Sequence, residues 1–405
     1  MLIRKRNYPK TIIEIFIYVI LISLPFSKAV VEISFGICMV TWFFWKVSVH
    51  KWRVSRYFTA SPTNKLLFIF FFTCALSLIG SFNFRLSLRA LFSKVWEYIF
   101  LYIFTVEVVD SSKKVKRIAT VLTFTAGLIV ADSMYQYVVG HDFLKGYPFY
   151  SSLNRRLTAS FSTSSAFGGW IILIAPILLG ISHIFTDKKA KGLALFLFFA
   201  LLLILVATQS RIAWMGIILS FVFFIFAWSR FLRRYVKLIL GAVFIAGTLY
   251  LVFCPYNRNL KAIFKGNDPS VEMHIRLWKQ AVDFIKERPI TGWGLNTYTE
   301  VARKYKEFDK GSFYPHNSFL QLAIETGVAG LLAFVFLLIA WFRCILYGAL
   351  RKGNLLLITV CMGVSAFLIQ SLFDNNLYAL SLAVFFWVVL GLGTAIARVE
   401  IRQSV

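Results

Sequence analysis

A histidine and a helix-capping residue stand together in the segment Tyr314–Gly327, which reads YPHNSFLQLAIETG. Asn317 is a preferred N-cap residue, and the apolar positions after it predict a helix that begins directly after His316. A helix N-terminus offers backbone N–H groups and about half a positive charge, which favours a bound phosphate. Histidine can accept a proton near neutral pH. The segment therefore predicts a site where a proton is removed beside a phosphate, with Asn317 among the binding residues.

The composition places this site at a membrane. Of the 405 residues, 59% are hydrophobic, and the mean hydropathy is +0.73. Soluble domains have an apolar content of about 45–50%. Apolar runs long enough to cross a hydrocarbon core recur along the whole chain. We expect an all-α integral membrane protein with about twelve transmembrane helices, at Ile12–Phe26, Ala29–Trp45, Leu66–Ser81, Leu91–Val108, Ile118–Val139, Ala166–Phe185, Leu193–Thr208, Ile212–Trp228, Val236–Cys254, Phe319–Phe342, Leu355–Leu372 and Leu377–Ala397.

The net charge of +26 is explained by the placement of the basic residues between the spans. If the N-terminus is cytoplasmic, every strongly basic cluster falls on the cytoplasmic side of a twelve-span path, as the positive-inside rule requires. We therefore expect both termini to be cytoplasmic, and we do not expect nucleic-acid binding. The clusters are Arg4–Arg6, Lys51–Arg56, Lys113–Arg117, Lys188–Lys191, Arg230–Lys237 and Arg351–Lys352.

The predicted organisation has three parts: spans 1–9 in residues 1–254, an outer loop in 255–315, and spans 10–12 in 316–405. Within the loop, Asp268-Pro269 predicts a helix start. The following helix carries Leu277, Trp278, Ala281, Val282 and Ile285 on one apolar face.

The rest of the loop contains a turn and a second helix. Gly292 and Gly294 predict a tight turn whose backbone can approach a ligand or another loop. Thr297–Glu300 reads as a capping box that starts a helix at Tyr298. We expect a small helical cap over the outer mouth of the bundle. It is too short for an independent enzyme, so chemistry must occur between cap and bundle.

Several cations break the charge bias by falling on the outer side. Arg211 is the least expected of them, because its connector between two spans is only a few residues long. A purely structural explanation is that the side chain of Arg211 extends to the membrane–water interface. The remaining outer cations, which can contact lipid headgroups or substrate phosphates, are Arg85, Arg89, Lys94, Arg155 and Arg156.

The sequence offers no recognisable cofactor site. The five cysteines lie in or at the ends of apolar runs without metal-type spacing, and the acids of the outer loop are scattered. We also find no glycine-rich nucleotide loop. We therefore expect neither a metal nor another cofactor.

Four segments, in this order, resemble motifs of the O-antigen ligase and polymerase superfamily of bacterial membrane glycosyltransferases. They are Gln209–Gly216, Arg276–Trp278, Arg288–Asn296 and Pro315–Gly327; Arg156–Ser164 resembles the shorter upstream motif. The resemblance implies a GT-C-type glycosyltransferase in the bacterial inner membrane, surrounded by membrane lipids. It would transfer a glycan from undecaprenyl diphosphate at the periplasmic face, without metal or nucleotide.

The resemblance also implies residue roles. His316 matches the essential histidine, and Arg211 and Arg276 match two essential outer-face arginines. A sugar hydroxyl needs a base such as His316, and guanidinium groups can stabilise a departing diphosphate. Further substrate-binding candidates are Arg85, Arg89, Arg155, Arg156, Arg288, Asn317 and Glu325, of which Glu325 is expected to pair with an arginine or a span residue. Asp132 and Asp374 receive no role, and His50, His141, His183 and His274 show no supporting constellation.

Three functions fit this pattern. A ligase would use lipid A–core as acceptor, and a polymerase would extend another lipid-linked glycan. The arginine that polymerases place eleven positions before a glycine is absent, since Arg156 leads to Phe167 and Arg276 to Glu287, which favours a ligase. A transporter of lipid-linked glycans would show repeats and polar groups near the bilayer midplane, whereas the polar groups here gather at one face. Direct attack by the acceptor would invert the anomeric centre, because no carboxylate is placed to form a glycosyl intermediate.

Overall fold

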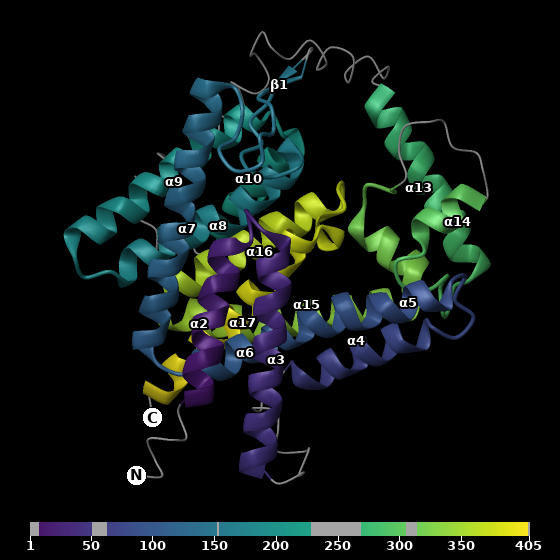
Figure 1. The fold of residues 1–405 in the computed structure, drawn as a ribbon, viewed down its shortest axis with the longest axis horizontal. Coiled ribbons are helices and arrows are strands. Elements are labelled where there is room, and N and C mark those ends of the chain that lie inside the picture. Colours follow the sequence, from purple (N-terminus) through teal and green to yellow (C-terminus); the bar gives the residue numbers. More distant parts are fainter. Residues whose placement is uncertain (1–7, 51–62, 152–153, 228–268, 305–313, 404–405) are drawn as a thin grey trace.

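The computed structural model describes residues 8–50, 63–151, 154–227, 269–304 and 314–403 (Figure 1). Within these ranges the chain is helical apart from one pair of two-residue antiparallel strands, so the predicted all-α class is confirmed with that small exception. The elements are α2 (Tyr8–Ser23), α3 (Lys28–His50), α4 (Asn64–Leu76), α5 (Phe84–Ala90), the π-helical turn η2 (Leu91–Trp96), α6 (Glu97–Val108), α7 (Ser112–Val139), β1 (Tyr150–Ser151), β2 (Asn154–Arg155), α8 (Ser164–Ile184), α9 (Lys188–Thr208), α10 (Arg211–Ala227), α13 (Pro269–Glu287), α14 (Tyr298–Lys304), α15 (Ser318–Lys352), α16 (Leu355–Ser371), the 3₁₀ turn η3 (Asn376–Tyr378) and α17 (Leu380–Gln403).

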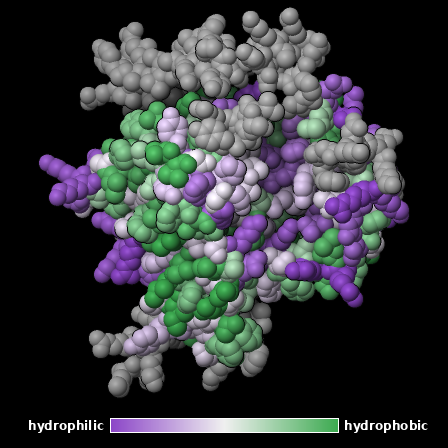
Figure 2. Space-filling model, turned by 45° about the horizontal axis from the view of Figure 1, so that its top comes forward, coloured by the Kyte–Doolittle hydropathy of each residue, from purple (hydrophilic) through white to green (hydrophobic). Residues whose placement is uncertain are grey.

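The described helices have the length and composition of membrane spans. Six of them are long and apolar enough to cross a bilayer, namely α3, α7, α8, α9, α15 and α17, and α4, α10 and α16 are shorter apolar helices. Each expected span has a described helix except Val236–Cys254, which lies outside the described residues. The chain is therefore a multi-pass membrane protein. Figure 2 shows broad hydrophobic surface on the bundle, with hydrophilic residues at its edges and in a hollow on this face.

Small residues let the central helices approach closely. Helix α16 packs against α8 and α10, and α17 packs against α6. A Cβ at Gly216 of α10 would lie 2.7 Å from the carbonyl oxygen of Ala366, so only glycine allows that approach. Such close contacts are typical of membrane helices, which gain little hydrophobic free energy from association.

Two ends of the bundle can be distinguished. At one end, α2, α6 and α7 are joined by ion pairs of Lys10 with Asp110 (2.8 Å) and Arg117 with Glu14 (3.0 Å). The final turns of α17 lie at this same end, beside Lys10 and Asp110. The cap helices α13 and α14 lie at the opposite side of the molecule (Figure 1).

The amphipathic cap helix forms where it was predicted. Helix α13 begins at Pro269 and ends at Glu287. Its residues Leu277, Ala281 and Phe284 are buried. Ala281 and Phe284 belong to a cluster that includes Trp293 and Ile324. Of the residues expected on the apolar face, Val282 is 40% exposed, and Phe284, outside that set, is buried.

The second cap helix begins at Tyr298 as predicted, but without the predicted capping box. The Thr297 hydroxyl donates to the carbonyl oxygens of Trp293 (3.1 Å) and Gly294 (2.7 Å). The Glu300 carboxylate accepts from Asn83 Nδ2 at 3.1 and 3.3 Å instead of reaching back along its own helix. Glu300 therefore joins the cap to the start of α5, while Thr297 closes the turn within the cap.

The glycine-containing turn of the cap docks against a break in α15. Gly327 leaves the helical conformation with φ +73° and ψ 176°. Backbone hydrogen bonds join Trp293 N to Ile324 O (2.8 Å), and Val328 N to Pro289 O (2.8 Å). A Cβ at Gly292 would lie 2.6 Å from the backbone of Glu325 and Gly327. The predicted close approach is thus made to another helix of the same chain.

Candidate active site

His316 occupies the position just before the N-cap of α15, in a conformation that is uncommon for this residue type. Its φ is +46°, in the left-handed region, where a side chain other than glycine is strained and has to be held by its surroundings. The cap itself is the predicted one: Asn317 Oδ1 accepts from Phe319 N and Leu320 N, both at 3.0 Å.

The first amides of α15 are already engaged. Besides the two that Asn317 accepts, Ser318 N donates to the carbonyl oxygen of Asp374 at 3.2 Å. The expectation that these N–H groups bind a phosphate is therefore wrong in this conformation. The side chain of Asn317 is likewise committed to α15, and it is only 8% exposed.

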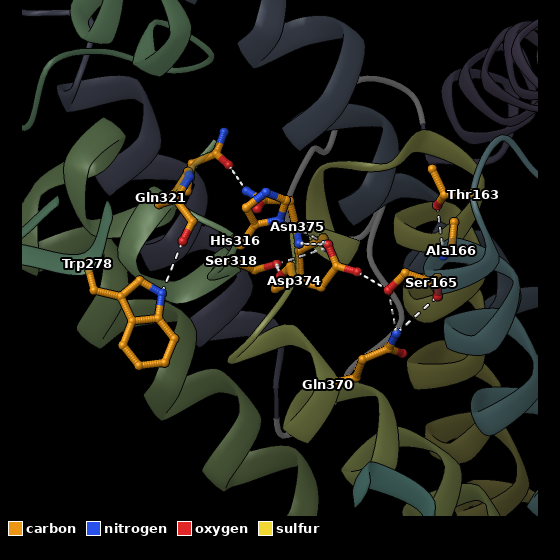
Figure 3. A network of polar contacts seen from close by, with 12 residues as sticks. Thr163, Ser165, Ala166, Trp278, His316, Ser318, Gln321, Gln370, Asp374 and Asn375 are labelled. Carbon is orange, nitrogen blue, oxygen red and sulfur yellow. Dashed lines mark hydrogen bonds and ion pairs between the residues drawn. The ribbon is translucent and has the colours of Figure 1, made fainter. Parts of the chain in front are cut away.

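Asp374, which sequence reasoning left without a role, faces His316. Its Oδ1 lies 3.9 Å from Nδ1 of His316 (Figure 3). The other carboxylate oxygen accepts from the hydroxyl of Ser165 in the first turn of α8, and Asn375 N donates to Oδ1 at 2.7 Å. Burial opposes ionisation, but His316 and the hydrogen bonds from Ser165 and Asn375 outweigh it and hold the pKa of Asp374 below its usual 3.8. The carboxylate is therefore charged at neutral pH.

His274 of α13 is a second histidine at this site. Its ring lies 5.2 Å from the ring of His316, with the planes at 64°. Burial lowers the pKa of His274 below 6.5, and the neighbouring His316 lowers it further. Sequence reasoning missed His274 and Asp374 because each stands alone in the chain, and only the fold brings them to His316.

Glu325 lies deeper, in a polar chain beneath the cap. It is 1% exposed and accepts from Gln321 Nε2 (3.0 Å) and Asn296 N (2.8 Å). Lys94 Nζ donates to Asn296 Oδ1 at 2.7 Å. Of the two expected partners, an arginine or a span residue, the structure has the second, because Gln321 lies in the expected span Phe319–Phe342. Lys94 reaches Glu325 only through Asn296.

A small cavity of about 70 Å³ adjoins this chain of hydrogen bonds below the start of α15. Its walls are mostly apolar and aromatic, and Lys94 and Glu325 supply its charged groups. The volume is comparable to that of a few water molecules. The cavity therefore fits solvent or a short apolar group in this conformation.

Two of the predicted arginines differ in their relation to His316. Arg211 is the exposed first residue of α10. The preceding Ser210 packs on Gly168 in the early turns of α8, close to Ser165, so Arg211 emerges at the same end as Asp374. Arg276 is exposed on α13, but it follows His274 by two residues and so points about 200° around the helix. Since His274 faces His316, Arg276 starts from the far side of α13.

The other predicted cations are spread around this end. Arg85, Arg89 and Arg156 are exposed, and Arg155 lies in β2. Arg288 lies over the ring of Trp293 at 4.2 Å and donates to the carbonyl oxygen of Gly80, so in this structure it helps to join the cap to the end of α4.

Asp132, also left without a role, anchors the loop after α7. Its carboxylate accepts from Phe143 N (2.9 Å) and the Ser160 hydroxyl (2.7 Å).

This arrangement suits removal of a proton from a bound hydroxyl. The Asp374 carboxylate beside the His316 imidazole would stabilise the positive charge that forms when this ring accepts a proton. Among the described residues, no group of three or more histidine, cysteine or acidic side chains could hold a metal ion. His274, His316 and Asp374 are neighbours but do not form a metal-binding group. The His316–Asp374 pair thus offers acid–base chemistry, and Arg211 lies at the same end of the bundle.

Comparison with known proteins agrees with this geometry. Residues 195–335 match the family described as O-antigen ligase, a range that contains Arg211, Arg276 and His316. The chain is similar to a putative polysaccharide ligase of Rickettsia bellii (strain RML369-C), with 27% identity over 206 residues, 48% of this chain and 50% of the relative. It is also similar to a ComP-specific O-oligosaccharyltransferase of Acinetobacter baylyi (strain ATCC 33305 / BD413 / ADP1), with 28% identity over 241 residues, 56% of this chain and 42% of the relative.

A third relative is the exopolysaccharide production protein ExoQ of Rhizobium meliloti (strain 1021), 30% identical over 95 residues, 22% of this chain and 21% of the relative. The chain thus spans about half or less of the length of these curated relatives. The similarity to the O-antigen ligase family is thus confined to residues 195–335, the range that contains Arg211, Arg276 and His316.

Proposed function

We propose that the protein is an O-antigen ligase of the GT-C type, which transfers a glycan from undecaprenyl diphosphate to a sugar hydroxyl of lipid A–core. The observation that carries the proposal is the His316–Asp374 pair, placed at the end of a membrane bundle where Arg211 also emerges. In this proposal the chain crosses a bacterial inner membrane about twelve times. Both termini lie in the cytoplasm, and the cap and His316 face the periplasm.

The proposed reaction is a direct displacement at the anomeric carbon. His316 accepts the proton of the acceptor hydroxyl while the oxygen of that hydroxyl forms the new glycosidic bond. The bond from the anomeric carbon to the diphosphate oxygen breaks, and the electron pair leaves with undecaprenyl diphosphate. Asp374 stabilises the imidazolium, and arginines stabilise the departing diphosphate. The anomeric configuration inverts because there is a single displacement.

The acceptor is the part of the proposal with a competing candidate. Relatives carry names as different as polysaccharide ligase, ComP-specific O-oligosaccharyltransferase and exopolysaccharide production protein. The last of these favours a second candidate, a polymerase that extends another lipid-linked glycan with the same base and donor.

Purified protein in lipid nanodiscs tests both candidates. It is given an undecaprenyl-diphosphate glycan together with lipid A–core or with a second lipid-linked glycan, and products are separated by mass. Product with lipid A–core alone supports the ligase, and elongated lipid-linked glycan alone supports the polymerase. Movement of unreacted donor between leaflets with neither product would replace both by a transporter.

A further inference from the structure

Two aromatic residues of α13 contact both segments that carry the proposed base and its carboxylate. His274 packs edge-to-face on His316. Trp278, one helical turn later, donates its indole N–H to the carbonyl oxygen of Pro315 at 3.1 Å (Figure 3). The ring of Trp278 also lies 5.7 Å from the ring of Phe373, the neighbour of Asp374. Residues four apart share a helix face, so one face of α13 reaches both segments.

The segments that this face contacts need such support. His316 has a left-handed backbone. Its loop precedes α15 and the loop of Asp374 follows α16, so the two loops are far apart in the sequence although they meet in space. Backbone and hydroxyl bonds of Ser318 to the Asp374 carbonyl join the loops on one side. The ring of His316 is not fixed by those bonds, and His274 contacts it directly.

His274 has one further property that fits a packing role in its neutral form. Its Nδ1 is buried and has no hydrogen-bond partner among the described residues. A charged imidazole with a buried, unpaired nitrogen would be costly. A neutral ring can instead stay beside the imidazolium that forms on His316 during transfer, because it adds no like charge.

We propose that His274 and Trp278 are positioning residues, which hold His316 against Asp374. The cap helix α13 would then help to orient the base. This rests on the proposed function, in which His316 accepts the proton. The proposal gives Trp278 a role of its own in the Arg276–Trp278 motif. Its indole N–H donates to the carbonyl oxygen of Pro315, the residue before His316.

The test separates packing from charge. His274→Phe keeps a flat ring and is expected to retain most of the transfer rate, whereas His274→Ala loses the ring and should lower kcat by at least ~10-fold with the donor KM nearly unchanged. Trp278→Phe keeps the contact with Phe373 but loses the N–H, and should lower kcat about 2–10-fold, as expected for one hydrogen bond. His183→Phe, an exposed histidine at the other end of α8, is the matched control with unchanged kinetics.

A second readout needs no substrate. The rate at which diethyl pyrocarbonate modifies His316, followed by mass spectrometry in nanodiscs, should rise in His274→Ala and Trp278→Phe and stay unchanged in His274→Phe. Normal kcat and unchanged modification in His274→Ala would overturn the proposal, as would a His274→Phe variant as impaired as His274→Ala. If His316→Ala retains full transfer, the proposed base itself is wrong, whereas an inactive His316→Ala beside a normal His274→Ala refutes only the positioning role.

Discussion

Nδ1 of His316 lies 3.9 Å from Oδ1 of Asp374, although one residue precedes α15 and the other follows α16. The carboxylate is oriented in turn by Ser165 of α8. The starts of α8 and α15 and the end of α16 therefore meet beside one imidazole, which is the base in the proposed reaction.

The first prediction concerns the base. His316→Ala should lower transfer by about 10²–10⁴-fold, the usual contribution of a general base. Donor binding, measured with a labelled undecaprenyl-diphosphate glycan, should stay close to that of the unmodified protein. His183→Ala is the control. Near-normal turnover in His316→Ala would exclude it as the base.

The second prediction concerns Asp374. Asp374→Asn keeps the size of the side chain but loses the charge that faces His316, so kcat should fall by roughly 10²-fold or more. The folded-state pKa of Asp374 lies below 3.8, so its ionised form contributes stability above that pH, and the contribution is lost as pH falls through the lowered pKa. The stabilisation that the unmodified protein has over Asp374→Asn should therefore be lost only below about pH 3.8. A stabilisation that already shrinks between pH 7 and 5 would contradict the lowered pKa.

The third prediction separates the two arginines. Lysine keeps the charge but loses the planar fork that engages two phosphate oxygens, so Arg211→Lys and Arg276→Lys should each lose most activity. Because α13 turns Arg276 away from His316, we expect Arg276→Lys to act mainly through a higher donor KM, and Arg211→Lys mainly through kcat. Lys279→Ala, exposed on the same helix, should be mild. Equal losses in all three variants would point to general loop charge instead of specific contacts.

The fourth prediction concerns the junction between cap and bundle. Gly327→Ala places a Cβ where the carbonyl oxygen of Ile290 lies, at a residue with φ +73°. The cap should detach, which lowers the melting temperature and speeds proteolysis of the cap. Gly348→Ala in the same helix meets nothing within 4 Å, so it should be neutral or stabilising by up to about 1 kcal/mol from helix propensity. Equal melting temperatures for the two variants would mean that the turn does not hold the cap.

The fifth prediction is that transfer requires neither ATP nor a divalent cation. In the proposed reaction the diphosphate leaving group supplies the driving force, and arginines stabilise its charge in place of a metal. Transfer by purified protein should continue in excess EDTA without nucleotide. Activity that vanished in EDTA and returned with Mg²⁺ would require a carboxylate site that the arginine mechanism lacks.

The sequence by itself determined the membrane class, the positions of most spans and the start of each cap helix. These follow from local physics: runs of apolar residues, proline and asparagine at helix starts, and the 3.6-residue period of an amphipathic helix. It also singled out His316, because the residue lies beside a cap signal that can be read from its own neighbours.

The tertiary structure alone decided what surrounds that histidine. Asp374, Ser165 and His274 lie on three other segments, and no local pattern links them to His316. It also decided how the polar side chains of the cap are used, since Glu300 bonds to Asn83 before α5, and Thr297 bonds to the carbonyl of Trp293 in its own turn. A capping signal fixes where a helix starts, but a buried polar side chain bonds to whichever group the packing brings within reach, and that depends on contacts distant in the sequence.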